Sequence, residues 1–362
     1  MKLPSAALIL LWAGAACCGG TVHAQNSLRP DADAFGRLLV PENGAYTGAY
    51  IDFGEAEDDV TLERIENFES AVGKHQAIIA SSSYWGQQTF PGKNLAIITR
   101  HGAIPLIYWS PWDKPYEQDR GPDQFSLEQI LAGKWDAYID SWAKQARSFG
   151  RPFFVAWGLE MNGTWFPWSG YFYGGGKPSG PGAFSGPELY KKAYRYVVDR
   201  VRMQGADNIL WVFHANNYSY PLEDWNALAR YYPGDAYVDW LGISAYGKQF
   251  AHDPWVSAED CLIYGYDELC ALNPGKPVML AEWGIGEFPK AGSKAEWITR
   301  AFATMRTRLP RLKAAVFWNE RWENEDGTYS NLRATSSPGA LDAYRSGVAD
   351  AFWLSSPKYR KP

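Results

Sequence analysis

Two glutamates in this sequence, Glu160 and Glu282, stand at the ends of apolar runs and close to tryptophans. Glu160 follows the β-branched and aromatic run 152–157, and Glu282 lies in segment 279–284, Met-Leu-Ala-Glu-Trp-Gly. A carboxylate at the end of a buried strand is costly unless it has a partner or a function. Glycoside cleavage needs two carboxyl groups that flank the bond. One such glutamate alone is as often a structural anchor, but the pair beside tryptophans predicts a sugar-cleaving site.

We predict different roles for the two carboxyl groups. Glu160 is expected to act as the general acid and then as the base, whereas Glu282 attacks the anomeric carbon. Their separation is expected to be about 5–5.5 Å, the distance that gives retention of configuration. Tyr246 ends the preceding apolar run and is expected to donate a hydrogen bond that keeps Glu282 ionised.

Aromatic and amide side chains near the predicted strand ends are candidate sugar ligands. The chain has 18 tryptophans and 22 tyrosines, more than a core alone requires. Several of these rings could still be core residues, and His214 could equally be a buried hydrogen-bonding residue. Glu287 and Glu320 are expected to be solvated or structural. The candidate ligands are Trp109, Trp165, Trp168, Tyr246, Trp318, His214 and Asn216.

Predicted strands alternate with predicted helices along the chain, and this pattern is typical of a (β/α)8 TIM barrel in a single domain. An open doubly wound sheet is disfavoured because no glycine-rich turn follows the first strand. One long helix is predicted over 126–149, with Ser126 as its cap. Active groups of such barrels lie at the carboxyl ends of the strands, which would bring Glu160 and Glu282 to one mouth. The predicted strands are 44–52, 76–82, 104–109, 153–160, 209–214, 237–246, 277–282 and 312–318.

The first 24 residues have the features of a secretory signal peptide. Lys2 precedes the apolar run 6–16, and small residues lead to a predicted cleavage site after Ala24. The run is too short for a membrane span. An alternative is lipidation of Cys17. We therefore predict a secreted or periplasmic protein.

The remaining chain is predicted to consist of an arm, 25–43, and the catalytic barrel, 44–355. Its two cysteines, Cys261 and Cys270, are expected to form a disulfide, as is common in exported proteins. Loss of the signal would change the net charge from −5 to −6, which argues against a nucleic-acid partner. The five histidines are scattered, so we predict no metal site and no cofactor. We expect a monomer.

Three motifs resemble glycoside hydrolase family 26 of clan A. Residues 160–168, Glu-Met-Asn-Gly-Thr-Trp-Phe-Pro-Trp, resemble the family's acid/base motif with its stacking tryptophan. Residues 281–284, Ala-Glu-Trp-Gly, resemble the nucleophile motif, and 244–247, Ser-Ala-Tyr-Gly, the tyrosine segment before it. The resemblance covers about residues 40–350. It implies a secreted retaining endo-β-glycanase that acts on a β-linked polysaccharide, most often β-1,4-mannan.

One segment departs from the family's pattern. Mannanases of the family typically have Arg-Pro-x-His before the acid/base glutamate, where this chain has Ala156-Trp157-Gly158-Leu159. The missing histidine would lie near the sugar's 2-hydroxyl, which is axial in mannose and equatorial in glucose. A leucine cannot make that polar contact. Mannan hydrolysis is therefore the first prediction, and mixed-linkage β-1,3-1,4-glucan hydrolysis is the alternative. The family's few β-1,3-xylan enzymes and a non-catalytic glycan-binding barrel in exopolysaccharide handling stay open.

Overall fold

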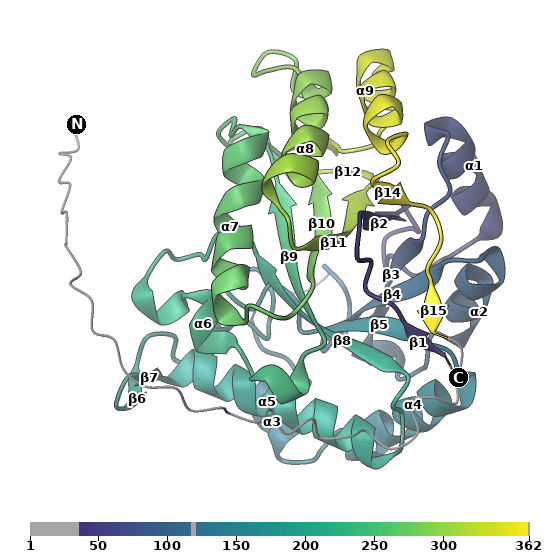
Figure 1. Cartoon of the computed structure of the whole chain (residues 1–362). Coiled ribbons are helices and arrows are strands. Elements are labelled where there is room, and N and C mark those ends of the chain that lie inside the picture. Colours follow the sequence, from purple (N-terminus) through teal and green to yellow (C-terminus); the bar gives the residue numbers. More distant parts are fainter. Residues whose placement is uncertain (1–35, 117–120, 361–362) are drawn as a thin grey trace, which may run out of the picture. The chain divides into compact units, whose positions relative to one another are not determined.

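Eight parallel strands close into a barrel in the computed structural model, which describes residues 36–116 and 121–360. Each strand pairs with the next around the ring, and β11 pairs with β2 to complete it (Figure 1). The predicted (β/α)8 barrel is confirmed. The barrel strands are β2 (Ala45–Tyr50), β3 (Ile78–Tyr84), β4 (Ile104–Ser110), β5 (Phe153–Trp157), β8 (Ile209–Asn216), β9 (Trp240–Tyr246), β10 (Val278–Gly284) and β11 (Leu312–Trp318).

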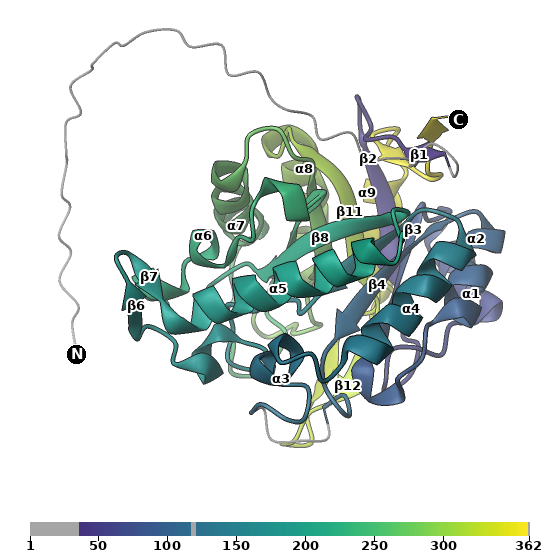
Figure 2. The ribbon, with the colours of Figure 1, turned by 90° about the horizontal axis from the view of Figure 1, so that it is seen from below.

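Helices connect the barrel strands and surround them (Figures 1 and 2). Five of these helices, α1, α3, α7, α8 and α9, begin after a serine or threonine whose side chain accepts a backbone N–H three residues on, which satisfies a donor at the helix start. The helices are α1 (Leu62–Val72), α2 (Gly92–His101), α3 (Leu127–Leu131), α4 (Asp136–Phe149), α5 (Ser185–Met203), α6 (Leu228–Tyr231), α7 (Ala258–Leu272), α8 (Lys294–Arg308) and α9 (Pro338–Val348). Short 3-10 segments are η2 (Trp85–Gln87), η3 (Gly170–Tyr173), η4 (Asp224–Asn226) and η5 (Asp235–Tyr237).

The helix predicted over 126–149 is two helices, α3 and α4. Ser126 caps α3 as expected, since its hydroxyl accepts the N–H of Gln129 at 3.4 Å. The chain then turns at Gly133, which has a φ of 79°. A positive φ ends a right-handed helix and favours glycine. The turn therefore sets α4 apart from α3.

Within the described residues, seven short strands lie outside the eight-strand ring. Strand β1 belongs to the described part of the predicted arm and pairs antiparallel with β15 near the chain's other end. The predicted signal peptide, its cleavage site and Cys17 lie outside the described residues. Within 36–116 and 121–360, no helix has both the length and the apolar character for crossing a bilayer. The strands are β1 (Arg37–Leu38), β6 (Pro178–Gly180), β7 (Ala183–Phe184), β12 (Arg321–Glu323), β13 (Tyr329–Asn331), β14 (Trp353–Leu354) and β15 (Tyr359–Arg360).

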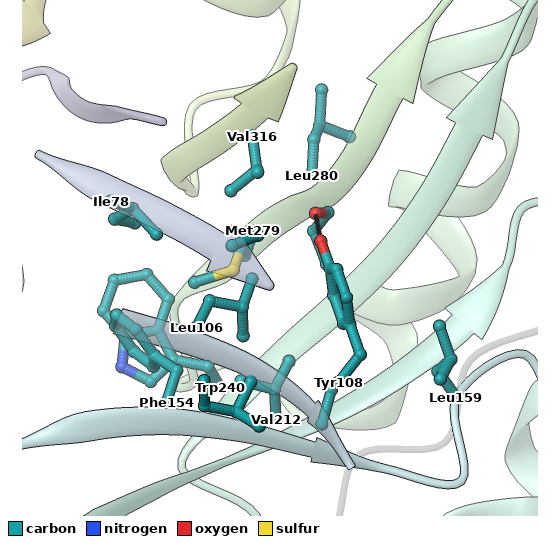
Figure 3. Packing of buried hydrophobic residues seen from close by; sticks show 14 of the residues in the cluster. Ile78, Leu106, Tyr108, Phe154, Leu159, Val212, Trp240, Met279, Leu280 and Val316 are labelled. Atoms are coloured by element: carbon teal, nitrogen blue, oxygen red, sulfur yellow. Dashed lines mark hydrogen bonds between the residues drawn. The ribbon is translucent and has the colours of Figure 1, made fainter. Parts of the chain in front are cut away.

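Successive side chains of β4 point alternately into the barrel interior and into the layer beneath the helices. Tyr108 points into the barrel core shown in Figure 3, where its hydroxyl donates to the carbonyl of Ala281 at 2.8 Å. The next residue, Trp109, points the other way and stacks on Trp142 of α4 with ring centroids 4.0 Å apart. Successive strand side chains face opposite sides of a sheet. Only every second residue of a barrel strand can therefore face the interior or its mouth.

The predicted disulfide is wrong, because both cysteines lie on the same helix. Cys261 and Cys270 are free thiols in α7. Nine residues at about 1.5 Å each separate them by roughly 13 Å along the helix axis. A disulfide requires Cα atoms within about 7 Å. Burial raises the pKa of the Cys261 thiol to about 12, which makes it unreactive at neutral pH.

Candidate active site

Glu160 lies in a tight turn beyond the carboxyl end of β5. The predicted strand ran to Glu160, but the chain leaves the sheet at Gly158, where φ is 56°. Glu160 itself has a φ of 52°, a conformation that costs a non-glycine residue on the order of 1 kcal/mol. Its N–H donates to the carbonyl of His214 at 2.8 Å, and the indole of Trp165 donates to its Oε2 at 2.6 Å. The carboxyl is thus fixed at the mouth.

Helix α5 and a buried tryptophan hold this turn in place. The hydroxyl of Tyr190 donates to the carbonyl of Gly158 at 2.9 Å, and the indole of Trp168 donates to that of Leu159 at 2.6 Å. A Cβ at position 158 would lie only 3.3 Å from Tyr190 and 3.4 Å from Trp168. Gly158 is therefore required both by its conformation and by the close approach of these rings.

Glu282 lies within β10, near its carboxyl end, in register with Ser244 of β9. Its Oε2 accepts the hydroxyl proton of Tyr246 at 2.6 Å, so the predicted hydrogen bond is present. The bond comes from the adjacent strand, where backbone pairing fixes the tyrosine. The carboxylate is consequently held in one orientation.

A serine and a histidine lie between the two carboxyls. The Nε2 of His214 lies 2.7 Å from the Oγ of Ser244 and 4.0 Å from the Oε1 of Glu282, while Ser244 also hydrogen-bonds to Glu160. His214 is 1% exposed, and burial lowers its pKa to about 3, so the ring is neutral. Its Nδ1 has no partner among the described residues. With the ring proton on Nε2, Nδ1 carries only a lone pair, so no buried N–H is left without an acceptor. Nε2 then donates to the Ser244 hydroxyl, which in turn donates to Glu160.

Burial raises the pKa of both glutamates. For Glu160, hydrogen bonds from Ser244 and Trp165 oppose the rise. For Glu282, repulsion by Glu160 adds to the burial, and the bond from Tyr246 opposes it. Two carboxylates that repel each other in a poorly hydrated site do not ionise together. Ionisation of one carboxyl therefore disfavours ionisation of the other.

Comparisons with known proteins place this site in a family. Residues 126–301, which include both glutamates, match the model of glycosyl hydrolase family 26. Endoglucanase H of Acetivibrio thermocellus is 29% identical over 82% of this chain. These similarities support glycoside hydrolase family 26 as the family of this chain. It spans 31% of the length of Endoglucanase H.

Two mannanases of Bacillus subtilis are also similar to this chain. A mannan endo-1,4-beta-mannosidase of strain 168 is 24% identical over 78% of this chain and 76% of its own length. The solved structure of the mannanase man26 superposes with a TM-score of 0.60, at 20% identity and 87% coverage of each chain. At this identity, the structural match supports the shared barrel fold.

Two of the tryptophans predicted as sugar ligands are almost completely buried. Trp109 has no exposed surface, and its indole donates to Tyr138 at 3.0 Å beneath the helices. Trp168 is 1% exposed and stacks on Phe166 with centroids 4.6 Å apart. The structure contradicts the prediction that these two rings contact substrate. Trp109 occupies the outward strand position, and Trp168 supports the turn at Glu160.

The other candidate ligands lie at or near the mouth. Trp165 is half-buried beside Glu160, whereas Trp318 is 7% exposed and stacks on Tyr50 at 4.0 Å. Asn216 is half-buried at the end of β8, and its amide donates to the carbonyl of Tyr218 at 2.8 Å. Trp165 and Asn216 keep accessible surface for a sugar, and Trp318 offers only a narrow edge.

Two further carboxyl groups lie near the pair, and the sequence prediction missed them. Glu57, in the loop after β2, is buried and accepts hydrogen bonds from Ser82 at 2.5 Å and Tyr116 at 2.8 Å. Glu320, expected to be solvated or structural, is half-buried and accepts the indole N–H of Trp318 at 2.9 Å. Both glutamates follow the carboxyl end of a barrel strand, and this position in the sequence could have indicated that they lie near the active site. Their charges contribute to the raised pKa of Glu282.

Removal of the Tyr246 hydroxyl should change the pH dependence of glycan hydrolysis. The hydroxyl stabilises the ionised form of Glu282, so Tyr246→Phe should raise the pKa of that carboxyl. The acidic limb of kcat/KM should move up by about one pH unit, and kcat should fall by about 10–100-fold. Tyr237→Phe removes a hydroxyl that bonds Asp199 at the opposite end of β9 and serves as the control. An unshifted acidic limb in Tyr246→Phe would contradict this role.

Substitution of Glu320 should alter the pH dependence of stability. Burial and repulsion by Glu57 raise the pKa of Glu320 to about 8, against an unfolded value of 4.5. The folded chain therefore keeps a proton that the unfolded chain releases, and stability falls as pH rises from 4.5 to 8. The change in Tm caused by Glu320→Gln should be more positive at pH 9 than at pH 4, by on the order of 2–5 °C. Calorimetry at both pH values tests this, with Glu325→Gln in the exposed hairpin as control; an equal effect at both would refute it.

Proposed function

We propose that this chain is a retaining endo-β-glycanase in which Glu160 is the acid/base and Glu282 the nucleophile. The observation that supports it is the pair itself. The two carboxyls flank β8 and β9, Ser244 and His214 lie between them, and Tyr246 orients Glu282. Repulsion by Glu160 also contributes to the raised pKa of Glu282.

In the first step of the proposed reaction, a Glu282 oxygen attacks the anomeric carbon while the proton of Glu160 passes to the glycosidic oxygen. The carbon–oxygen bond to the leaving sugar breaks, and a covalent glycosyl–Glu282 ester forms. In the second step, Glu160 takes a proton from water, whose oxygen displaces Glu282. Two inversions give net retention, and the cycle requires one carboxyl to be charged and the other to be protonated.

For the substrate, we propose β-1,4-mannan. The similarity to the Bacillus subtilis mannan endo-1,4-beta-mannosidase supports this choice. A second candidate is mixed-linkage β-1,3-1,4-glucan. It is supported by the apolar Leu159, which is 5% exposed beside Glu160, and by the similarity to Endoglucanase H.

The test is incubation of the purified protein with galactomannan, glucomannan, lichenan, barley glucan and β-1,3-xylan, followed by identification of the oligosaccharides. Rapid loss of viscosity with few reducing ends would indicate internal cleavage. Products from galactomannan support the mannan proposal, and products from lichenan but not from galactomannan support the glucan one. Binding without new reducing ends would overturn the hydrolase proposal in favour of a glycan-binding barrel.

We also propose that the chain is exported. Residues 1–24 support this through their lysine, apolar run and small residues. The amino-terminal sequence of protein recovered from the periplasm or medium should begin at Gln25. Recovery from the cytoplasm with residue 1 retained would contradict export.

A further inference from the structure

Two histidines that are far apart in the sequence meet one glutamate at the far end of the barrel. Glu69 lies on α1, His75 precedes β3 and His101 ends α2. The Oε2 of Glu69 lies 3.0 Å from the Nδ1 of His75 and 3.0 Å from the Nε2 of His101. All three atoms lie within 4.8 Å of one another. Three donor atoms therefore converge on one point.

This triad is separate from the candidate active site. His75 and His101 precede β3 and β4, so they lie near the amino ends of the barrel strands, whereas Glu160 and Glu282 lie at the carboxyl ends. Parallel strands place these ends on opposite sides of the barrel. A function of the triad must therefore differ from that of the carboxyl pair.

Two imidazoles and one carboxylate form a donor set typical of zinc and related divalent transition metals. Bonds of about 2.0–2.1 Å in a tetrahedral site put ligand atoms roughly 3.3 Å apart, close to the two 3.0 Å distances. The other oxygen of Glu69 accepts the N–H of Gln76 at 2.8 Å, which orients the carboxylate toward the histidines. The His75 side chain is 32% exposed, and water can reach a fourth position.

We propose that Glu69, His75 and His101 bind a zinc ion, or a divalent ion of the same class such as nickel, that joins α1 to α2. The sequence predicted no metal site because its histidines are scattered, and the barrel brings two of them together. The ligands span 32 residues, so the complete site exists only in the folded chain. Metal binding therefore stabilises the fold.

The test is calorimetric titration of the chelator-treated protein with zinc chloride. We expect one zinc per chain, and a Tm increase of about 5 °C at a hundredfold excess of free zinc over Kd. His75→Ala and Glu69→Gln should each weaken zinc binding by about 100-fold and remove the Tm increase. Magnesium should have no effect, since it prefers sites with more oxygen ligands.

Two control variants and one activity measurement make the test specific. His252→Ala removes a histidine whose side chain is 83% exposed, and Cys270→Ser removes a partly exposed thiol; both should bind zinc like the unchanged chain. Circular dichroism without zinc should show that His75→Ala is folded. Chelation should leave glycan hydrolysis unchanged well below Tm, which separates this proposal from the proposed function. Absence of zinc binding, or equal affinity in a folded His75→Ala variant, would overturn it.

Discussion

Glu282→Ala should lower the turnover of the glycan substrate by a factor on the order of 10⁴ or more and leave glycan binding nearly intact. The substitution removes the atom that forms the covalent intermediate, whereas the Tyr246 hydroxyl and the aromatic residues of the mouth stay. Azide should restore part of the rate, because the small anion fits the vacated space and attacks the anomeric carbon directly. The measurement is the initial rate of chain cleavage, followed by loss of viscosity and by chromatography of the oligosaccharides, with and without azide, because a glycosyl azide has no reducing end.

The product formed with azide distinguishes this role from a structural one. Direct attack by azide is a single displacement, so the glycosyl azide should have the inverted configuration. Glu325→Ala removes an exposed carboxylate outside the carboxyl pair, and this variant should hydrolyse glycan at the same rate as the unchanged chain. A Glu282→Ala variant that hydrolyses glycan at nearly the unchanged rate would remove the nucleophile assignment.

Glu160→Ala should show a loss of activity that depends on the leaving group. Hydrolysis of polysaccharide should fall by about 10³–10⁴-fold, because the departing sugar alkoxide needs the proton of Glu160. An aryl glycoside with an acidic phenol needs little protonation, so its first step should be nearly unaffected. A burst of phenol followed by slow turnover should appear, since no base then activates water against the glycosyl–Glu282 ester. Stopped-flow absorbance measures both phases.

Azide provides the matching control for Glu160→Ala. In this variant the anion attacks the glycosyl–Glu282 ester, so two displacements occur and the glycosyl azide should have the retained configuration. The opposite outcomes for Glu160→Ala and Glu282→Ala would assign the two roles independently. An equal loss with phenol and sugar leaving groups in Glu160→Ala would contradict the acid role.

The barrel was predictable because its strands are buried on both faces. A parallel strand between helices and a packed interior needs a continuous apolar run, and such runs are visible without any knowledge of contacts. The predicted strand 312–318 matches β11 residue for residue. Helix ends were less predictable, as the turn at Gly133 shows, because one residue with positive φ interrupts an otherwise continuous pattern.

Side-chain direction and burial were harder to predict. Trp109 lies at a strand end, yet it faces α4 because Tyr108 occupies the inward position. Trp168 follows Glu160 closely, but the turn folds it underneath. The cysteine pair failed for a simpler reason, since both thiols lie on α7, nine residues apart and farther than a disulfide can span.

The sequence by itself determined the eight-strand barrel, the two strand-end glutamates and the tyrosine that bonds Glu282, because each depends on local apolar runs and on the rule that strand ends share one mouth. Only the tertiary structure decided which aromatic rings stay accessible, that Glu57 and Glu320 lie near the pair, and that His75 and His101 meet at Glu69. Those outcomes depend on loop paths and on contacts between segments far apart in the chain. A local sequence pattern does not indicate which distant residue a given side chain will contact.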